Sequence, residues 1–252
     1  MTELLVDQRG AVRWLRLNRP HRRNALDPTL IGALDQAVTD AEADPGTTVL
    51  VIAGQGPSFC AGADLTHLLR LATEGRRVVE FLSRVSALFS RLETTELPIV
   101  AALHGHAVAG GLELALACDV VIATEDTLIG DGHVRNQLLP AGGASVRLPR
   151  RVGPALARYL MLTGNLLPAT ELRGWLHDVV PTGQLDNTAQ RVAEELATAA
   201  GPAQSRVKRL LVRTDALSPA EGLEAELTTF AAHWDSAPVA DALREFLAVR
   251  QA

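Results

Sequence analysis

Residues 97–124, LPIVAALHGHAVAGGLELALACDVVIAT, contain the alternation of element types that decides the fold. The run 98–103 is continuously apolar, which is typical of a strand covered on both faces, and 119–124 predicts another strand. Between them a glycine-rich junction leads into 112–118, whose composition predicts a short helix. The segment is long enough to span a membrane, but four ionisable residues interrupt it: His104, His106, Glu113 and Asp119. We therefore interpret it as the buried interior of an α/β protein.

The rest of the chain extends this pattern in both directions. Strand-like runs are expected at 3–8, 11–17 and 47–54. Helical patterns are expected after Asp27-Pro28 and from about Arg76 to Leu92, and almost all of the sequence after Gly153 also reads as helix. We predict an α/β body, 1–195, followed by a helical C-terminal region, 196–252.

The composition excludes several classes of protein. Of the 252 residues, 47% are hydrophobic and 21% charged, which excludes intrinsic disorder. A net charge of −5 and only three Trp, one Tyr and five Phe argue against nucleic acid as the main partner. Two cysteines in apolar surroundings, Cys60 and Cys118, and an acidic N-terminal segment in place of a basic signal sequence predict a cytoplasmic protein.

Two glycine-rich junctions, each between a buried strand and a helix, are the candidates for chemistry: FCAGADL at 59–65 and HGHAVAGGLEL at 104–114. The common signatures of nucleotide hydrolases, classical dehydrogenases, zinc enzymes and serine hydrolases are absent from the sequence. The first amides of a helix lack internal partners, and glycine lets a ligand approach the main chain closely. If the amides of Ala63 and Gly110 converge, they are expected to bind an oxyanion.

Glu113 follows Gly110 by nearly one helical turn, so its carboxylate is expected beside whatever these amides hold. Desolvation in an apolar stretch raises the pKa of a carboxyl group, which suits a general acid or base. Either junction alone is also consistent with an ordinary turn. A lone Glu in an apolar stretch is also consistent with an ion pair to a buried Arg. Two such junctions in one chain favour catalysis.

Several segments together resemble the enoyl-CoA hydratase/isomerase family, also called crotonases. The central match is 97–124, and GPSFCAGADL at 56–65 resembles the family's earlier oxyanion segment. Flanking matches are RPHRRNAL at 19–26, LPAGGASVRLPRRVG at 139–153 and SAPVADALREFLAVR at 236–250. The resemblance implies a ClpP/crotonase-like spiral of repeated strand-strand-helix turns, with C-terminal helices that assemble homotrimers or homohexamers.

The resemblance also implies an acyl-CoA thioester as the ligand. The amides of Ala63 and Gly110 would hold the thioester oxygen and stabilise an enolate, and Glu113 matches the first catalytic carboxylate of the hydratases. The residues expected to contact the CoA part of the ligand are Arg22, Arg23, Asn24, Ala25 and Leu26, together with Gly62, Asp64 and Leu65 of the oxyanion segment. No metal or redox cofactor is expected, because two amides and a proton carrier are sufficient for enolate chemistry.

The sequence departs from the family at the second catalytic carboxylate. Typical hydratases place a Glu seven residues before the proline of the later glycine-rich turn, and counting back from Pro140 leads to His133. Three roles are open for His133: an acid/base partner of Glu113, a polar wall of the acyl pocket, or a surface histidine without function. Asp131 is a weaker substitute for the missing carboxylate.

The leading hypothesis is an enoyl-CoA hydratase that adds water across a 2-enoyl-CoA. The same site also fits double-bond isomerisation, decarboxylation or thioester hydrolysis, because all of these use the same enolate. A third possibility, from another class, is a non-catalytic subunit that binds acyl-CoA. Neither a nucleic acid nor a membrane is expected as a partner.

Other chemically capable side chains are interpreted as structural. Cys60 and Cys118 read as small core residues, and His106 as a structural histidine. A solvated face or a trimer contact is expected for three basic residues, Arg147, Arg150 and Arg151.

Overall fold

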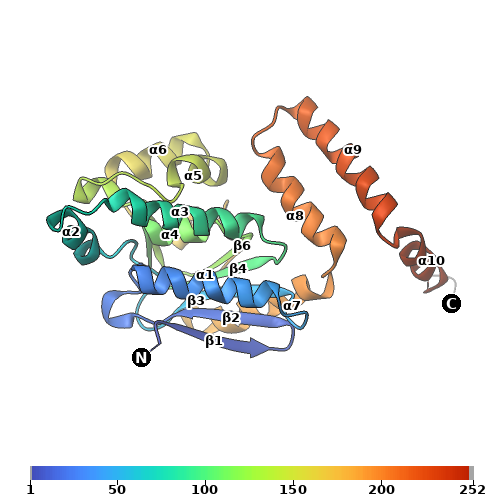
Figure 1. The fold of residues 1–252 in the computed structure, drawn as a ribbon, viewed down its shortest axis with the longest axis horizontal. Helices are drawn as coiled ribbons and strands as arrows, with labels where there is room; N and C mark the ends of the chain where they lie inside the picture. The colour runs from blue at the N-terminus through green and yellow to red at the C-terminus, as the bar shows by residue number, and fades with distance from the viewer. Residues whose placement is uncertain (1, 250–252) are drawn as a thin grey trace. The chain divides into compact units, whose positions relative to one another are not determined.

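The computed structural model describes residues 2–249, and the chain divides into two compact units (Figure 1). The first unit ends at Thr198 and the second begins at Ala199. Helix α7 (Leu185–Thr198) closes the first unit, so the boundary expected after residue 195 falls inside a helix. No helix in the described part of the chain is long and apolar enough to cross a membrane.

A six-stranded sheet forms the centre of the first unit. Its order is β1-β2-β3-β4-β6-β9, with β1 antiparallel to β2 and every other neighbouring pair parallel. Every residue of β3 and β4 is buried, which explains their continuously apolar sequences. The strands are β1 (Leu4–Arg9), β2 (Val12–Leu17), β3 (Val49–Gly54), β4 (Ile99–Leu103), β6 (Val120–Thr124) and β9 (Asp178–Val180).

A second sheet contains three short strands, β5 (His106–Val108), β7 (Leu128–Gly130) and β8 (Leu167–Pro168), in the order β5-β7-β8. The chain passes from β4 in the large sheet to β5 in the small one and then into α4 (Gly110–Leu116), and from β6 it passes again to β7. This repeat of strand, strand and helix is the expected spiral.

The sequence after Gly153 was expected to be almost entirely helical, and strands β8 and β9 correct this. They have two and three residues, which is too short for a period-two pattern to be visible. They form because β7 and β6 each offer a free edge: Leu167 pairs with Ile129, and Val179 with Ala123.

Helices connect and cover these strands. Helix α1 begins where Asp27 and Pro28 predict it, because the Asp27 carboxylate accepts a hydrogen bond from Leu30 N at 2.9 Å. Helix α2 follows the first glycine-rich junction as expected: the Asp64 carboxylate caps it, and Leu71 is buried while Leu65 and Leu69 are exposed. The helices are α1 (Pro28–Glu42), α2 (Leu65–Thr73), α3 (Val78–Thr94), α5 (Ala144–Val152) and α6 (Pro154–Thr163), with short 3-10 turns at Pro20–Arg22, His133–Asn136, Ala169–Leu172 and Thr182–Gln184.

The large sheet has a hydrophobic cluster on each face. Leu15 and Leu17 of β2 point into the larger cluster, which also contains the buried faces of α1, α3 and α4. Val12 and Trp14 point into the smaller cluster, which α7 covers. Side chains of β2 therefore point alternately into two hydrophobic clusters, one on each face of the sheet. The larger cluster supports the site described below.

The second unit consists of α8 (Pro202–Thr214), α9 (Pro219–Ser236) and α10 (Val239–Val249). A capping box starts α9: Glu221 N–H donates to the Ser218 hydroxyl at 3.4 Å, and Ser218 N–H donates to the Glu221 carboxylate at 2.9 Å. Helix α9 exposes a row of large apolar side chains at steps of three and four residues, namely Leu223, Leu227, Phe230 and Trp234.

Candidate active site

The two glycine-rich junctions lie together because the first pairs with the strand that leads into the second. Cys60 forms a bridge with Ala107 of β5: its N–H donates to His106 O at 3.0 Å, and Val108 N–H donates to Cys60 O at 3.1 Å. On the other side Ala63 forms a bridge with Leu26. The oxyanion segment 59–65 therefore reaches the start of α4.

The amides of Ala63 and Gly110 lie close together. A Cβ atom added to Gly62 would be 3.1 Å from Gly110 N, and one added to Gly110 would be 3.4 Å from Ala63 N. Gly62 also has φ +94°, a conformation that side chains rarely adopt. Within residues 2–249 neither amide donates to a protein acceptor, so both are available to one oxygen atom of a ligand.

Ala109, directly before Gly110, has φ 52° and ψ −118°. A residue with a Cβ adopts such a conformation at a cost of about 1–3 kcal/mol. Two hydrogen bonds hold it: Ala109 N–H donates to Gly130 O at 3.1 Å, and Ala109 O accepts from Glu113 N at 2.9 Å. Strain held in this way is typical of functional sites, and here it orients the amide that follows.

Glu113 is only 3% exposed, on the first turn of α4. Its Oε1 atom accepts hydrogen bonds from Gly142 N at 2.8 Å and from Ala144 N at 3.0 Å. Burial raises the pKa of this carboxyl group, and these amides together with His133 only partly offset the effect. The alternative of an ion pair between Glu113 and a buried Arg is wrong, since the amides hold it instead.

His133 faces Glu113 across a short gap. Its Nε2 atom is 3.9 Å from Glu113 Oε2, and its Nδ1 atom is 3.0 Å from Asp131 Oδ2. The side chain is only 10% exposed, which contradicts the alternative of a surface histidine. Burial lowers the pKa of His133, but the hydrogen bond and charge of Asp131 and the charge of Glu113 outweigh it, so the pKa is raised.

Arg147 is the residue of this site that the sequence analysis missed. Its side chain is only 11% exposed, so the expected solvated face or trimer contact is wrong for it, although Arg150 and Arg151 are exposed. Its Nη1 atom donates to Gly142 O at 2.6 Å, and its guanidinium binds the Glu93 carboxylate through two atoms, at 2.7 and 2.5 Å. Arg147 therefore fixes the turn whose amides hold Glu113. The sequence shows only that Arg147 lies three residues after Ala144, and it gives no sign of the contacts with Gly142 and Glu93.

The segment expected to contact CoA has two side chains that are turned inward. Asn24 is fully buried: its amide donates to Gln55 O and Ser58 O, and its oxygen accepts from Arg19 N. The Asp64 carboxylate caps α2 and pairs with Arg19 at 3.1 Å. Both side chains help to build the loops, and Asp64 also lines a hollow on the surface, so the expected contacts of Asn24 and Asp64 with CoA stay a prediction.

Arg19 connects the pieces of this region. Its guanidinium donates to Ala25 O and lies 3.1 Å from both Asp27 Oδ2 and Asp64 Oδ2. Burial raises the pKa of Asp64, but the His67 amide and Arg19 outweigh that effect and the pKa is lowered. The Leu26 side chain is buried, Ala25 is half-buried and Leu65 is exposed.

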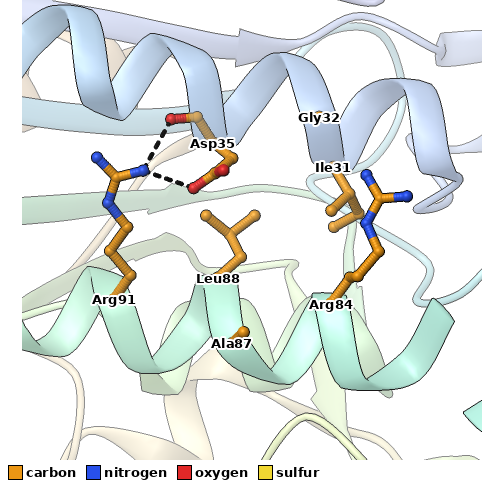
Figure 2. A pocket seen from close by; sticks show the side chains of 7 residues that line it. All are labelled: Ile31, Gly32, Asp35, Arg84, Ala87, Leu88 and Arg91. Carbon is orange, nitrogen blue, oxygen red and sulfur yellow. Dashed lines mark hydrogen bonds and ion pairs between the residues drawn. The ribbon is translucent and has the colours of Figure 1, made fainter. Parts of the chain in front are cut away.

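Several hollows open on the surface of the first unit. One, of about 320 Å³, is lined by Arg22, Asp27, Pro28, Thr29, Asp64, Thr66, His67 and Arg70. Its charged residues include two arginines, Arg22 and Arg70, and two aspartates that both lie 3.1 Å from Arg19, whereas the exposed Arg23 is not part of it. Figure 2 shows another, of about 350 Å³, between α1 and α3, where Arg91 donates to the carboxylate and the carbonyl of Asp35. The second hollow shares no residue with the site around Glu113.

The remaining candidates are structural, as expected. Cys60 and Cys118 are buried, and burial raises the pKa of the Cys60 thiol to about 12, so it carries no thiolate near neutral pH. His106 Nδ1 is 3.3 Å from the Ser58 hydroxyl.

Comparison with known proteins identifies the family. The sequence profile of the enoyl-CoA hydratase/isomerase family matches residues 7–252. The chain belongs to that family. It is 40% identical to a Thermus thermophilus protein assigned to the enoyl-CoA hydratases, over 86% of this chain and 85% of the other. A Rhizobium meliloti protein with the same assignment is 34% identical, over 99% and 96% of the two chains.

This member of the enoyl-CoA hydratase/isomerase family has the same fold as solved structures of enoyl-CoA hydratases. The crystal structure of an enoyl-CoA hydratase from Polaromonas sp. JS666 has a TM-score of 0.91 at 29% identity, covering 97% of this chain and 96% of the other. The expected crotonase-like fold is therefore confirmed. Among residues 2–249, no group of three or more His, Cys, Asp and Glu side chains is arranged to hold a metal ion. The expected independence from metal and redox cofactors stays a prediction.

Proposed function

We propose that this protein is an enoyl-CoA hydratase, which adds water across the 2,3 double bond of an enoyl-CoA thioester. One observation carries the proposal: the buried carboxylate of Glu113 faces His133 at 3.9 Å, in the helix turn that begins with the free Gly110 amide. Relatives named as enoyl-CoA hydratases support the same reaction. The substrate class is therefore a 2-enoyl-CoA.

The amides of Ala63 and Gly110 would stabilise the enolate. Attack at Cβ of an α,β-unsaturated thioester moves negative charge onto the thioester oxygen. Two fixed amides aimed at that oxygen stabilise the charge more than they stabilise the neutral substrate, which lowers the barrier. Removing one donor of such a pair typically costs about 2.7–4 kcal/mol in barrier height.

Glu113 and His133 would divide the proton transfers. Glu113 Oε2 accepts a proton as the water oxygen bonds to Cβ, and the enolate forms. His133, as the imidazolium, then gives its Nε2 proton to Cα while the thioester carbonyl is restored. A proton passes from Glu113 to His133 and resets the pair, so one H and one OH are added in total.

The 3.9 Å gap suits this division. A water molecule bound to both Glu113 Oε2 and His133 Nε2 fits, because each hydrogen bond is about 2.8 Å long. Oε1 of Glu113 is occupied by two amides, so Oε2 is the atom left for the water. His133 thus takes the position of the missing second carboxylate.

The hollow that Arg22 and Arg70 line is proposed to take the CoA phosphates, with these two guanidinium groups as the anion-binding groups. A chain of net charge −5 needs such a local positive charge to bind a polyphosphate ligand. With few aromatic residues, the adenine would be held by backbone and aliphatic contacts. No metal or redox cofactor takes part in the proposed reaction. CoA enters as part of the substrate and is not a separate cofactor.

The proposal extends to assembly and location. The exposed apolar row on α9 supports a homotrimer, or a homohexamer of two trimers. Two cysteines that are both buried as small core residues, Cys60 and Cys118, support a reducing compartment such as the cytoplasm.

The direct test is hydration of crotonyl-CoA, followed as loss of the enoyl-thioester absorbance. Glu113→Gln is expected to lower kcat about 100- to 10,000-fold, because it removes the base. His133→Ala should lower it as well. Glu125→Gln, at an exposed turn after β6, is the matched control and should leave kcat unchanged.

Other outcomes distinguish the alternatives. Full activity of Glu113→Gln, or unchanged turnover by His133→Ala, contradicts the proton-transfer roles. A product other than the 3-hydroxyacyl-CoA would instead indicate an isomerase, decarboxylase or thioester hydrolase. Binding of acyl-CoA without any turnover would indicate a non-catalytic subunit.

A further inference from the structure

Asp131 is a buried acidic residue that the proposed reaction leaves without a role. It is only 1% exposed, directly behind His133 as seen from Glu113. A carboxylate is costly to bury unless hydrogen bonds or a positive charge compensate for it. The buried Asp131 carboxylate therefore needs a partner that donates hydrogen bonds and carries a positive charge.

His133 is that partner. Asp131 Oδ2 lies 3.0 Å from His133 Nδ1, and Asp131 Oδ1 accepts a hydrogen bond from His133 N at 3.4 Å. Gly132 between them has φ +64°, which turns the chain so that residues 131 and 133 point the same way. Both oxygens of the carboxylate are thus directed at one residue.

The ring of His133 lies between two carboxylates that come from different elements. Asp131 follows β7, and Glu113 belongs to α4. Two nearby cations are occupied elsewhere: Arg147 of α5 pairs with Glu93, and Arg135 donates to Asn165 after α6 at 2.6 Å. The surroundings of the ring within residues 2–249 are therefore acidic on both sides.

We infer that Asp131 is a positioning residue, which holds His133 with Nδ1–H on Asp131 and the reactive Nε2–H toward Glu113, and which keeps the ring in its imidazolium form for catalysis. The inference rests on the proposed hydratase function. Hydrogen bonding at one ring nitrogen fixes which nitrogen is free to react. A neutral His133 with its proton on Nδ1 would have none on Nε2 to give to Cα.

This arrangement explains how a histidine can replace a glutamic acid. In the proposed reaction the group at position 133 must carry a proton to Cα while Glu113 is ionised. A lone imidazole in a buried site tends to be neutral, because burial disfavours the charged form. The fixed negative charge of Asp131 reverses that preference, so the pair of Asp131 and His133 supplies the acid.

The test is Asp131→Asn, which keeps the shape and removes the charge. We expect kcat for crotonyl-CoA to fall roughly 10- to 100-fold with KM nearly unchanged, since general acid catalysis contributes about 10²–10⁴-fold in total. The descending limb of the pH profile of kcat should move to lower pH, because the imidazolium loses its proton more readily. Asp126→Asn, in an exposed turn, is the matched control.

A double-mutant cycle separates positioning from mere folding. In the His133→Gln background, Asp131→Asn should have no further effect on kcat, because the group it acts through is gone. An equal loss of kcat in both backgrounds, or an unchanged descending limb in the single variant, would overturn the inference.

A second measurement does not depend on turnover. With 13Cε1-labelled histidine, the NMR titration of His133, assigned through the His133→Gln variant, should show a lower pKa in Asp131→Asn than in the unmodified protein. An unchanged titration refutes the inference even if hydration is intact. If no enoyl-CoA is hydrated, the proposed function fails, and this titration alone decides whether Asp131 governs the ring.

Discussion

The two oxygens of Glu113 have different environments, and this difference has chemical consequences. Oε1 accepts two amide hydrogen bonds, while Oε2 faces His133. The amides fix the carboxylate plane and support its ionised form, while burial favours the neutral form. In the proposed reaction, this rigid carboxyl group exchanges protons through Oε2 alone.

Gly142→Ala tests how much this rigidity matters. A Cβ atom at residue 142 would lie 2.6 Å from Glu113 Oε2 and 2.9 Å from Phe89 Cε2, so Glu113 must move. Loss of kcat by at least about 100-fold is expected, because misplacement by 1 Å can cost that much. Gly174→Ala is the control, since nothing lies within 4 Å of its added Cβ. Near-normal kcat for Gly142→Ala would show that the position of Glu113 is not critical.

The pH dependence of kcat follows from the two raised pKa values. Glu113 must be ionised to accept a proton, so activity rises with pH through a pKa above the usual 4.5. His133 must be protonated to donate, so activity falls through a pKa above the usual 6.5. A bell-shaped profile is expected, and its two apparent pKa values belong to the coupled pair. A rate that keeps rising above pH 9 would contradict the role of His133 as an acid.

At the scale of elements, helix α3 supports the turn that holds Glu113. Phe89 and Glu93 lie four residues apart and therefore on one face of α3. Phe89 packs under Gly142, and Glu93 binds Arg147 of α5, which in turn binds Gly142 O. The turn is thus fixed from both helices.

Removing this support should weaken both stability and activity. Arg147→Met leaves Glu93 partly buried without its cation, which is expected to cost about 2–4 kcal/mol in the free energy of unfolding, measured with urea. We expect kcat to fall about 10-fold as the 142–144 turn loosens. Adding Glu93→Gln to the Arg147→Met variant should restore part of the lost stability, but it should not restore kcat. Arg150→Met, at an exposed position, should change neither, and an equally mild effect of Arg147→Met would argue against the supporting role.

Elements with local signals were predictable, and those that depend on tertiary partners were not. Asp27 and Pro28 mark the start of α1 through a side-chain cap and a fixed backbone angle, both of which are local. Strand β9 has three residues and exists because Ala123 and its neighbours in β6 offer an edge. Helix α2 combines a local and a tertiary signal, because Asp64 caps it and also pairs with the distant Arg19.

At the scale of the molecule, the same distinction applies to the site. The close approach of the Ala63 and Gly110 amides was visible in the sequence, because glycine at 62 and 110 is needed for two main chains to come so close. The inward orientation of Asn24 and the role of Arg147 were not, since each depends on a partner more than 25 residues away. A polar residue in a ligand-binding loop can build the loop as readily as touch the ligand, and only the fold distinguishes the two.

Assembly of several chains can be tested through the apolar row on α9. Burial of Leu227 and Phe230, which are 72% and 59% exposed in a single chain, would stabilise a trimer by roughly 1.5–3 kcal/mol for each side chain. Light scattering coupled to gel filtration should give a mass of about 80 kDa, three times 26.8 kDa, or twice that for a hexamer. Phe230→Asp should shift the mass toward the single chain while circular dichroism stays helical, and Glu226→Gln on the same helix should not. A mass of one chain for the unmodified protein, or a Phe230→Asp variant that assembles normally, would contradict the use of this face.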